Sequence, residues 1–329
     1  MNFPKPLKKG DNIFLLCPSS PIVPEEDIDR CIKAIRYLGY NPVLGKSLYE
    51  NYGGYMAGSP EIRVNDIHRA FSEKDIKGIF CVKGGYSSSQ LLDKIDYELV
   101  RQNPKIFVGY SDVTNLHIVF NQKCDLGTYH GPMVKSNMFD DFNEYTENSF
   151  LEALQKESWD YKEPENSELS ILDQEILNQK IFQLNKESYK KLKTEISGTL
   201  IGGNLAIIVT TLGTEYEIDT KGKILFLEDV DEQIGSLNRM LTHLKYAGKF
   251  DDCNGVILGN FADCNNRYIT SDKKDYGVTE LLTDFFKNYE KPVISGIESG
   301  HGKPFMATLP LGADCTVNIE TKKISFKKN

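Results

Sequence analysis

A serine stands where a strongly apolar run of the chain gives way to a polar one. The stretch FVGYSDVTNL covers residues 107–116, and Ser111 lies at the join. The pattern predicts a strand-to-helix turn, which can hold a hydroxyl clear of a sheet with amides and a helix dipole facing any oxyanion. By themselves these ten residues favour the simpler role of a helix cap. Val113 also occupies the position where the G-x-S-x-G elbow has its second glycine.

A serine nucleophile needs a base, and the chain has five histidines. Two of them fall within helical patterns, where packing or surface roles are expected: His68 and His243. His117 follows Ser111 on the same predicted helix, which turns it away from the hydroxyl. His130 in TYHGPM and His301 in ESGHGKPF lie in predicted loops. We favour His301, which is flanked by glycines, as the base, with His130 as the alternative. On spacing alone, either residue could equally be an ordinary loop histidine without a catalytic role.

An orienting acid is expected where the apolar run KGKILFLEDVDEQ ends in two carboxylates, Glu228 and Asp229. A carboxylate at the carboxyl end of a strand can accept an imidazole N–H, fix its tautomer and stabilise the imidazolium. A solvated acidic turn explains the same charges, and spacing alone does not choose between the two carboxylates.

Backbone donors for an oxyanion are expected in FCVKGGYSSSQLL, where Gly84 and Gly85 separate a predicted strand from a predicted helix. A glycine turn lets main-chain amides approach a substrate closely. The same turn could hold a phosphate or a carboxylate, but it is neither a P-loop nor G-x-G-x-x-G.

The elements that position these residues alternate along the chain. Apolar runs such as NIFLLCP and PKIFVGYS are separated by amphipathic segments such as EEDIDRCIKAIRYLGY. This pattern predicts an α/β protein whose N-terminal domain, residues 1–150, is built on a parallel sheet with sites at the carboxyl ends of its strands. Residues 151–196 are expected to form a polar connector. Residues 197–329 are expected to form a smaller, strand-rich C-terminal α/β domain.

Composition excludes several classes of protein. The chain has 329 residues and a formal net charge of -8, which argues against nucleic-acid and anionic-membrane surfaces as partners. The apolar run near the N-terminus is too short for a signal peptide, and no run approaches a membrane span, so we expect a cytoplasmic protein. Seven cysteines without ligand spacing indicate free thiols rather than disulfides or a zinc site.

Five segments in order resemble the LD-carboxypeptidase family of serine peptidases, which includes muramoyl-tetrapeptide carboxypeptidases and microcin C immunity proteins. They are KGGYSSSQLLDKIDYELVRQNPKIFVGYSDVTNLH, GTLIGGNL, ILFLEDV, NRMLTHLKYAGKFDDCNGVILG and GHGKPFMATLPLG. Together they span nearly the whole chain. The resemblance implies an N-terminal domain carrying the serine and a C-terminal domain carrying the acid and base, with the active site at the interdomain cleft. It also implies a homodimer that uses no cofactor and no metal.

The resemblance assigns roles to individual residues. Ser111 of the G-Y-S-D motif is the implied nucleophile, Glu228 the acid, and His301 the base. The implied oxyanion donors are the backbone N–H groups of Gly85 and Asp112. The carboxylate of Asp112 is then expected to be an ordinary first-turn helix group.

The substrate is left between two branches of the family. Lys83 and Ser87 stand where muramoyl-tetrapeptide enzymes usually have arginine and glycine, and the run around them is closer to the immunity branch. That branch cleaves an aminoacyl or peptidyl nucleotide, whereas the other releases terminal D-alanine in murein recycling. Substrate contacts are expected from Gly84 and Tyr86. Stacking is a further possibility for Tyr189 or Trp159, where a packed or exposed aromatic is the simpler interpretation.

Two rival classes stay open at this stage. A cysteine amidotransferase could use Cys17 or Cys81 at the ends of predicted strands. A non-catalytic binding protein could also be built from two α/β lobes.

Overall fold

The computed structural model describes residues 1–139, 142–164, 195–267, 276–302, 304–318, 321 and 323–328. The chain forms two compact units. Unit 1 comprises Met1–Glu157, Thr308–Ala313 and Lys328–Asn329, and unit 2 comprises Ser158–Ala307 and Asp314–Lys327.

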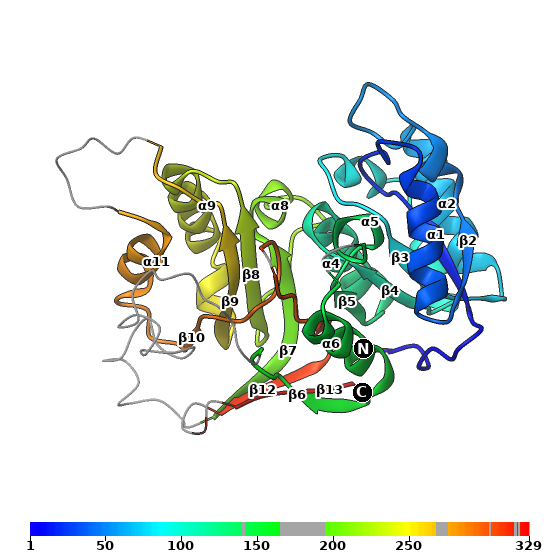
Figure 1. Ribbon diagram of the computed structural model, residues 1–329. Helices are drawn as coiled ribbons and strands as arrows, with labels where there is room; N and C mark the ends of the chain where they lie inside the picture. The colour runs from blue at the N-terminus through cyan, green and yellow to red at the C-terminus, as the bar shows by residue number, and fades with distance from the viewer. Residues whose placement is uncertain are drawn as a thin grey trace. The chain divides into compact units, whose positions relative to one another are not determined.

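Unit 1 is built on a six-stranded sheet with the order β11-β5-β4-β3-β1-β2 (Figure 1). Its strands are β1 (Asn12–Leu16), β2 (Asn41–Leu44), β3 (Ile76–Cys81), β4 (Ile106–Gly109), β5 (Thr128–His130) and β11 (Leu309–Leu311). Neighbours from β2 to β5 are parallel, and only β11 runs antiparallel, against β5. The carboxyl ends of β1, β3 and β4 therefore share one edge of the sheet.

Helices connect the parallel strands of unit 1. They are α1 (Asp27–Tyr37), α2 (Pro60–Ser72), α3 (Tyr97–Gln102), α4 (Thr114–Cys124), α5 (Val134–Asn137) and α6 (Glu144–Gln155), with short 3-10 helices η1 (Lys46–Tyr49), η2 (Ser88–Leu91) and η3 (Ser111–Val113). The start of α2 shows how the local sequence sets a boundary. The Ser59 hydroxyl accepts from the N–H of Ile62, and Pro60 opens the first turn, where a missing N–H costs nothing.

Unit 2 is built on a seven-stranded mixed sheet with the order β10-β9-β8-β7-β12-β13-β6. Its strands are β6 (Ser158–Asp160), β7 (Glu195–Asn204), β8 (Ile224–Val230), β9 (Gly255–Ala262), β10 (Val293–Ile294), β12 (Asp314–Asn318) and β13 (Lys323–Lys327). The run from β10 to β7 is parallel, and the other three strands pair antiparallel. Its helices are α8 (Leu205–Thr210), α9 (Ile234–Tyr246), α10 (Lys249–Asp252) and α11 (Val278–Phe286).

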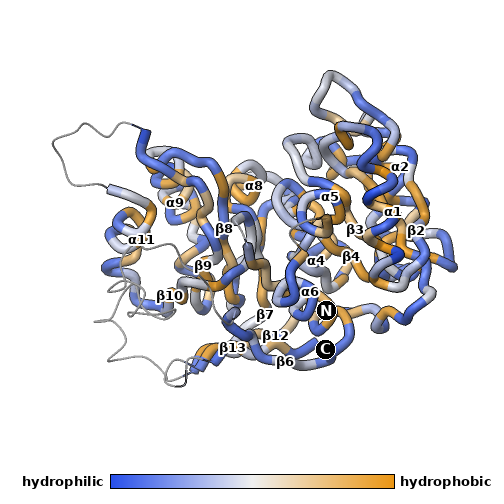
Figure 2. Tube along the Cα trace, in the orientation of Figure 1, coloured by the Kyte–Doolittle hydropathy of each residue, from blue (hydrophilic) through white to orange (hydrophobic). Residues whose placement is uncertain are grey.

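Apolar residues recur on both the strands and the helices, as the orange segments of Figure 2 show. Four residues of β1 and all four residues of β4 are buried. Strands buried in this way belong to parallel sheets covered on both faces. The α/β fold predicted from the sequence, with a parallel sheet first and a strand-rich region second, is confirmed.

Three features of the chain bear on the predicted connector. Helix α6 runs to Gln155, and β6 pairs with β13 at the edge of the second sheet. Within β6, Trp159 is 8% exposed and lies 5.6 Å from the ring of Phe326, so it packs in unit 2. Tyr189 lies outside the described residues.

In the described part of the chain, no helix combines the length and apolar character needed to cross a bilayer.

Candidate active site

Ser111 follows β4 and opens η3 with a backbone φ of 63°. The residues that cap η3 and α4 are Tyr110 and Val113, so Ser111 is not the capping residue of either helix. A left-handed conformation is uncommon for a residue with a Cβ, and such strain concentrates at functional sites. The strand-to-helix turn expected from the sequence is therefore present, in the strained form that presents a serine side chain.

The double-glycine turn lies against this serine within unit 1. A Cβ added to Gly84 would lie 2.9 Å from Cβ and 3.0 Å from Oγ of Ser111. Gly85 has a φ of 149°, and a Cβ there would lie 2.0 Å from Oγ of Ser20. Neither glycine leaves room for a side chain, because Gly84 packs against the turn after β4 and Gly85 against the residues that follow β1. The next residue, Tyr86, is 85% exposed.

The carboxylate of Asp112 has a larger role than expected from the sequence. It is 2% exposed, and its Oδ2 accepts from the N–H groups of Ser87 and Ser88 at 2.9 and 2.8 Å. The hydroxyl of Ser19 also donates to Oδ2, at 2.6 Å. Asp112 lies in the first turn of η3, as expected, but its carboxylate is not an ordinary group there, because its donors come from the turns after β1 and β3. The position of Ser19 and Ser87 just beyond apolar strands is the one signal that could have pointed to them.

Unit 2 brings Glu228 and His301 together. Nδ1 of His301 lies 2.7 Å from Oε2 of Glu228, and the backbone N–H of His301 donates to the same oxygen at 2.9 Å. Glu228 lies in β8 and is fully buried. Gly300 has a φ of 99°, and a Cβ there would lie 2.5 Å from Oε2 of Glu228. The glycine before the histidine thus allows its loop to reach the carboxylate.

The electrostatic surroundings of His301 favour its charged form. Burial lowers the pKa of the imidazole, but the charge and hydrogen bond of Glu228, with a contribution from Asp229, outweigh burial and raise the pKa overall. Asp229 is itself bound elsewhere: it accepts from Asn204 Nδ2 and from the N–H groups of Ala206 and Val230. Burial raises the pKa of Asp229 to about 6. Of the two carboxylates that the sequence left open, Glu228 is the one hydrogen-bonded to the histidine.

The alternative base, His130, is not in a loop. It ends strand β5, pairs with Leu309 of β11 and is fully buried. That part of the sequence prediction was wrong, because the strand is too short to show a period and is formed by its neighbours. His117 is also fully buried, between the Gly109 carbonyl and the Thr128 hydroxyl, and burial lowers its pKa to about 3. Both rings pack in the core of unit 1.

The remaining histidines lie in helices, as the sequence predicts. In α2, Nε2 of His68 accepts the backbone N–H of Asp96, which ties that helix to the start of α3. His243 lies in the last turn of α9.

The alternative of a cysteine nucleophile finds little support in the structure. All seven cysteines are buried free thiols. Burial raises the pKa of both Cys17 and Cys81, which disfavours the thiolate that a cysteine nucleophile needs. Among the described residues, no group of three or more histidine, cysteine or carboxylate side chains is arranged to hold a metal ion.

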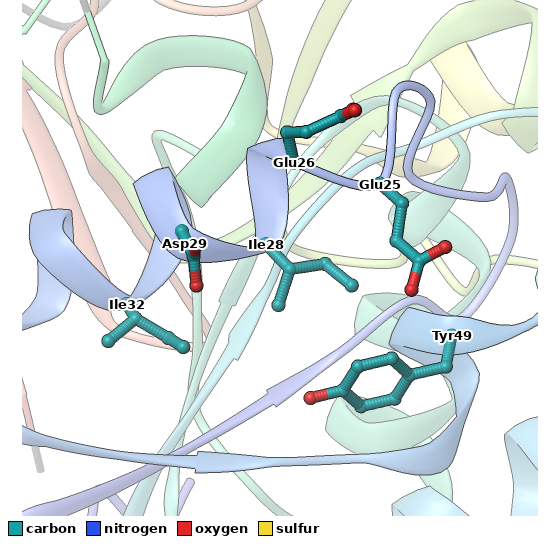
Figure 3. Close-up of a pocket in the computed structure, with 6 residues that line it drawn as sticks. All are labelled: Glu25, Glu26, Ile28, Asp29, Ile32 and Tyr49. Atoms are coloured by element: carbon teal, nitrogen blue, oxygen red, sulfur yellow. The ribbon is translucent and has the colours of Figure 1, made fainter.

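A pocket in unit 1 lies apart from the predicted residues. It is lined by Glu25, Glu26, Ile28, Asp29, Ile32 and Tyr49, and Figure 3 shows the side chain of Ile28 in α1 pointing toward Tyr49 of η1. None of the candidate catalytic residues lines this pocket.

Comparisons with known proteins agree with the fold. Residues 13–131 match the LD-carboxypeptidase N-terminal domain, and residues 197–317 match the LD-carboxypeptidase C-terminal domain. The chain is 34% identical to the probable murein peptide carboxypeptidase of Bacillus subtilis, over 97% of this chain and 92% of that protein. It is 30% identical to the microcin C7 self-immunity protein MccF of Escherichia coli, over 98% and 94%.

Solved structures extend the likeness to three dimensions. MccF in the apo state of an inactive mutant superposes with a TM-score of 0.83 at 29% identity, covering 99% of this chain and 98% of that one. An MccF-like protein from Bacillus anthracis gives 0.79 at 27% identity, over the full length of both chains. Fold and comparisons together define a two-unit α/β peptidase. The chain belongs to the LD-carboxypeptidase family.

Proposed function

We propose that the chain is a serine peptidase with Ser111 as nucleophile, His301 as base and Glu228 as orienting acid. The observation that carries the proposal is the pair of hydrogen bonds from His301 to the buried Glu228 carboxylate. A donor at Nδ1 leaves Nε2 as the basic nitrogen of the neutral ring, which is the arrangement that a triad requires. The strained backbone of Ser111 supports the choice of nucleophile.

The proposed reaction is hydrolysis of an amide through an acyl-enzyme. His301 takes the Ser111 proton as the oxygen attacks the carbonyl carbon, and Glu228 stabilises the imidazolium. The N–H groups of Gly85 and Asp112 donate to the oxyanion. The imidazolium then protonates the leaving amine, and water releases the acyl group.

The proposed substrate is a small peptide-like amide, with Gly84, Tyr86 and Tyr189 as proposed contacts. Two relatives suggest two forms of it: the name of one refers to murein peptides, and that of the other to self-immunity against microcin C7. Lys83 and Ser87 at the double-glycine turn favour an aminoacyl or peptidyl nucleotide. The alternative substrate is a murein tetrapeptide that loses its terminal D-alanine. The name of the more similar of the two relatives, the Bacillus subtilis protein, supports this alternative.

The substrate is tested by offering both compounds to the purified enzyme and analysing the products by mass spectrometry. Cleavage of the aminoacyl nucleotide alone supports the immunity-type activity. Release of D-alanine alone contradicts it and supports the murein activity.

The nucleophile is tested by Ser111→Ala on whichever compound is cleaved. Loss of the nucleophile in a triad enzyme lowers kcat by roughly 10⁴- to 10⁶-fold. Ser72→Ala, at an exposed position of α2, is the matched control and should retain full activity. Wild-type rates in Ser111→Ala would refute the proposed mechanism.

We also propose that the enzyme acts as a cytoplasmic homodimer without a metal ion. Light scattering in solution tests the dimer. Activity after exhaustive dialysis against a chelator tests the second part, and a loss restored by a divalent metal would contradict it.

A further inference from the structure

We propose that the carboxylate of Asp112 is a positioning group that locks the double-glycine turn to the serine turn; this inference rests on the proposed serine mechanism. The two proposed oxyanion donors, the N–H groups of Gly85 and Asp112, belong to different turns. Their spacing therefore depends on whatever ties these turns together. A misplacement of about 1 Å in such a site can lower the rate about 10²-fold.

The Asp112 side chain supplies that tie. A single oxygen, Oδ2, accepts two backbone N–H groups beyond the double glycine, those of Ser87 and Ser88, and the hydroxyl of Ser19. Three donors on one ionised oxygen form charge-assisted bonds, which are about twice as strong as neutral ones. The carboxylate thus joins the turns that follow β1, β3 and β4.

The same two turns are joined a second time through Ser88. Its hydroxyl donates to the backbone carbonyl of Asp112 at 2.6 Å, and Asn115 Nδ2 donates to that hydroxyl at 3.0 Å. Ser88 therefore donates two hydrogen bonds to Asp112, one from its backbone N–H to the carboxylate and one from its hydroxyl to the backbone carbonyl. Two separate points of attachment fix orientation as well as distance.

Arg63 also hydrogen-bonds to the double-glycine turn. The side chain comes from α2 and is fully buried. Its Nη1 donates to the carbonyl and hydroxyl oxygens of Ser87 at 3.0 and 2.9 Å and to the Pro18 carbonyl at 3.0 Å. Its Nη2 donates to Gln90 Oε1 at 2.8 Å. The buried Arg63 guanidinium and the buried Asp112 carboxylate thus both hydrogen-bond to Ser87.

The decisive variant is Asp112→Asn, which keeps the backbone N–H and nearly the same shape but removes the charge. We expect kcat to fall about 10- to 100-fold while KM stays within about threefold, because the loss affects the transition state rather than substrate binding. A boronic acid analogue of the substrate, which forms a tetrahedral adduct with Ser111, should lose affinity by a similar factor.

Asp66→Asn is the matched control. Asp66 is also 2% exposed in unit 1, and its carboxylate accepts the N–H groups of Lys46 and Ser47, which open η1. We expect Asp66→Asn to lower Tm as Asp112→Asn does and to leave kcat and boronate affinity unchanged. Should Asp112→Asn fail to fold, Ser19→Ala, which removes one donor, should lower kcat about tenfold.

The outcomes separate the two proposals. Suppose that Ser111→Ala is inactive, and that Asp112→Asn has the same kcat and boronate affinity per folded molecule as the control Asp66→Asn. The positioning role is then refuted and the serine mechanism stands. Ser19→Ala is compared with the control in the same way if Asp112→Asn does not fold. If Ser111→Ala retains full activity, the mechanism itself fails. A selective loss of kcat and boronate affinity in Asp112→Asn supports both.

Discussion

One oxygen of Glu228 holds both the ring and the backbone of His301, at 2.7 Å from Nδ1 and 2.9 Å from the backbone nitrogen. The carboxylate is fully buried in β8, so little water competes for these bonds. Glu228 therefore fixes both the position and the tautomer of the histidine.

Glu228→Gln should lower kcat by about 10³- to 10⁴-fold, because the amide neither enforces the tautomer nor stabilises the imidazolium. Steady-state kinetics on the cleaved substrate provide the measurement. Glu217→Gln is the matched control, since Glu217 is a partly buried carboxylate of unit 2 that pairs with Lys249. Equal activities of the two variants would show that Glu228 is not the orienting acid.

The raised pKa of His301 predicts how activity depends on pH. The base must be neutral, so kcat/KM should fall as pH decreases through a pKa above the ordinary value of 6.5. In Glu228→Gln, His301 stays buried but loses the carboxylate that raises its pKa. The fall in kcat/KM, which is the acidic limb of the pH profile, should therefore move to lower pH. An NMR titration of the imidazole provides an independent reading. A limb that stays in place would argue that another group controls it.

The same shift has a stability counterpart with a definite sign. A histidine whose pKa is raised by folding stabilises the protein fully below about pH 6.5, and this contribution is lost as pH rises through the folded-state pKa. The difference in unfolding free energy between wild type and His301→Gln should thus be larger at pH 6 than at pH 9. Denaturant unfolding at the two pH values measures it, and an opposite trend would contradict the pKa direction.

Gly84→Ala should lower kcat about 10²-fold by displacing the Ser111 side chain, which lies within 3.0 Å of the added Cβ. Gly10→Ala is the control, because φ is 89° there and no atom lies within 4 Å. We expect the control to cost about 1–2 kcal/mol of stability and no activity. An active Gly84→Ala would mean that the two turns can separate without harm.

Gly300→Ala tests the loop that carries His301, the proposed base. The added Cβ would lie 2.5 Å from Oε2 of Glu228, and the φ of 99° adds strain. We expect loss of nearly all activity, measured per folded molecule, with a fall in Tm. Gly248→Ala has a similar φ of 74° and open space, so it should lower Tm but keep kcat.

Much of the fold could be predicted from the sequence because its longer strands are continuous apolar runs that are easily recognised. NIFLL and IFVG are apolar on both faces, and amphipathic segments such as α1 separate the strands, which dictates a covered parallel sheet. The turn at Ser111 could be placed for the same reason, since the apolar strand stops just before it. The spaced motifs that resemble the LD-carboxypeptidase family are likewise properties of the sequence alone.

Short elements and long-range partners could not be predicted in this way. The three residues of β5 become a strand only because β4 and the distant β11 flank them, and this pairing buries His130. Likewise, β6 exists because β13 pairs with it. Hydrogen bonding between strands, rather than local periodicity, decides such elements.

By itself, the sequence determined the order of the strands and helices, the strand-to-helix join at Ser111 and the set of side chains able to perform chemistry. The tertiary structure decided which of them meet. It paired Glu228 rather than Asp229 with His301, as the family resemblance implied and spacing did not, and it alone brought Asp112 to Ser19 and Ser87. The physical reason is that a buried carboxylate takes its partners from whichever donors share its edge of the sheet. Those donors are set by strand order in space, which spacing along the chain does not reveal.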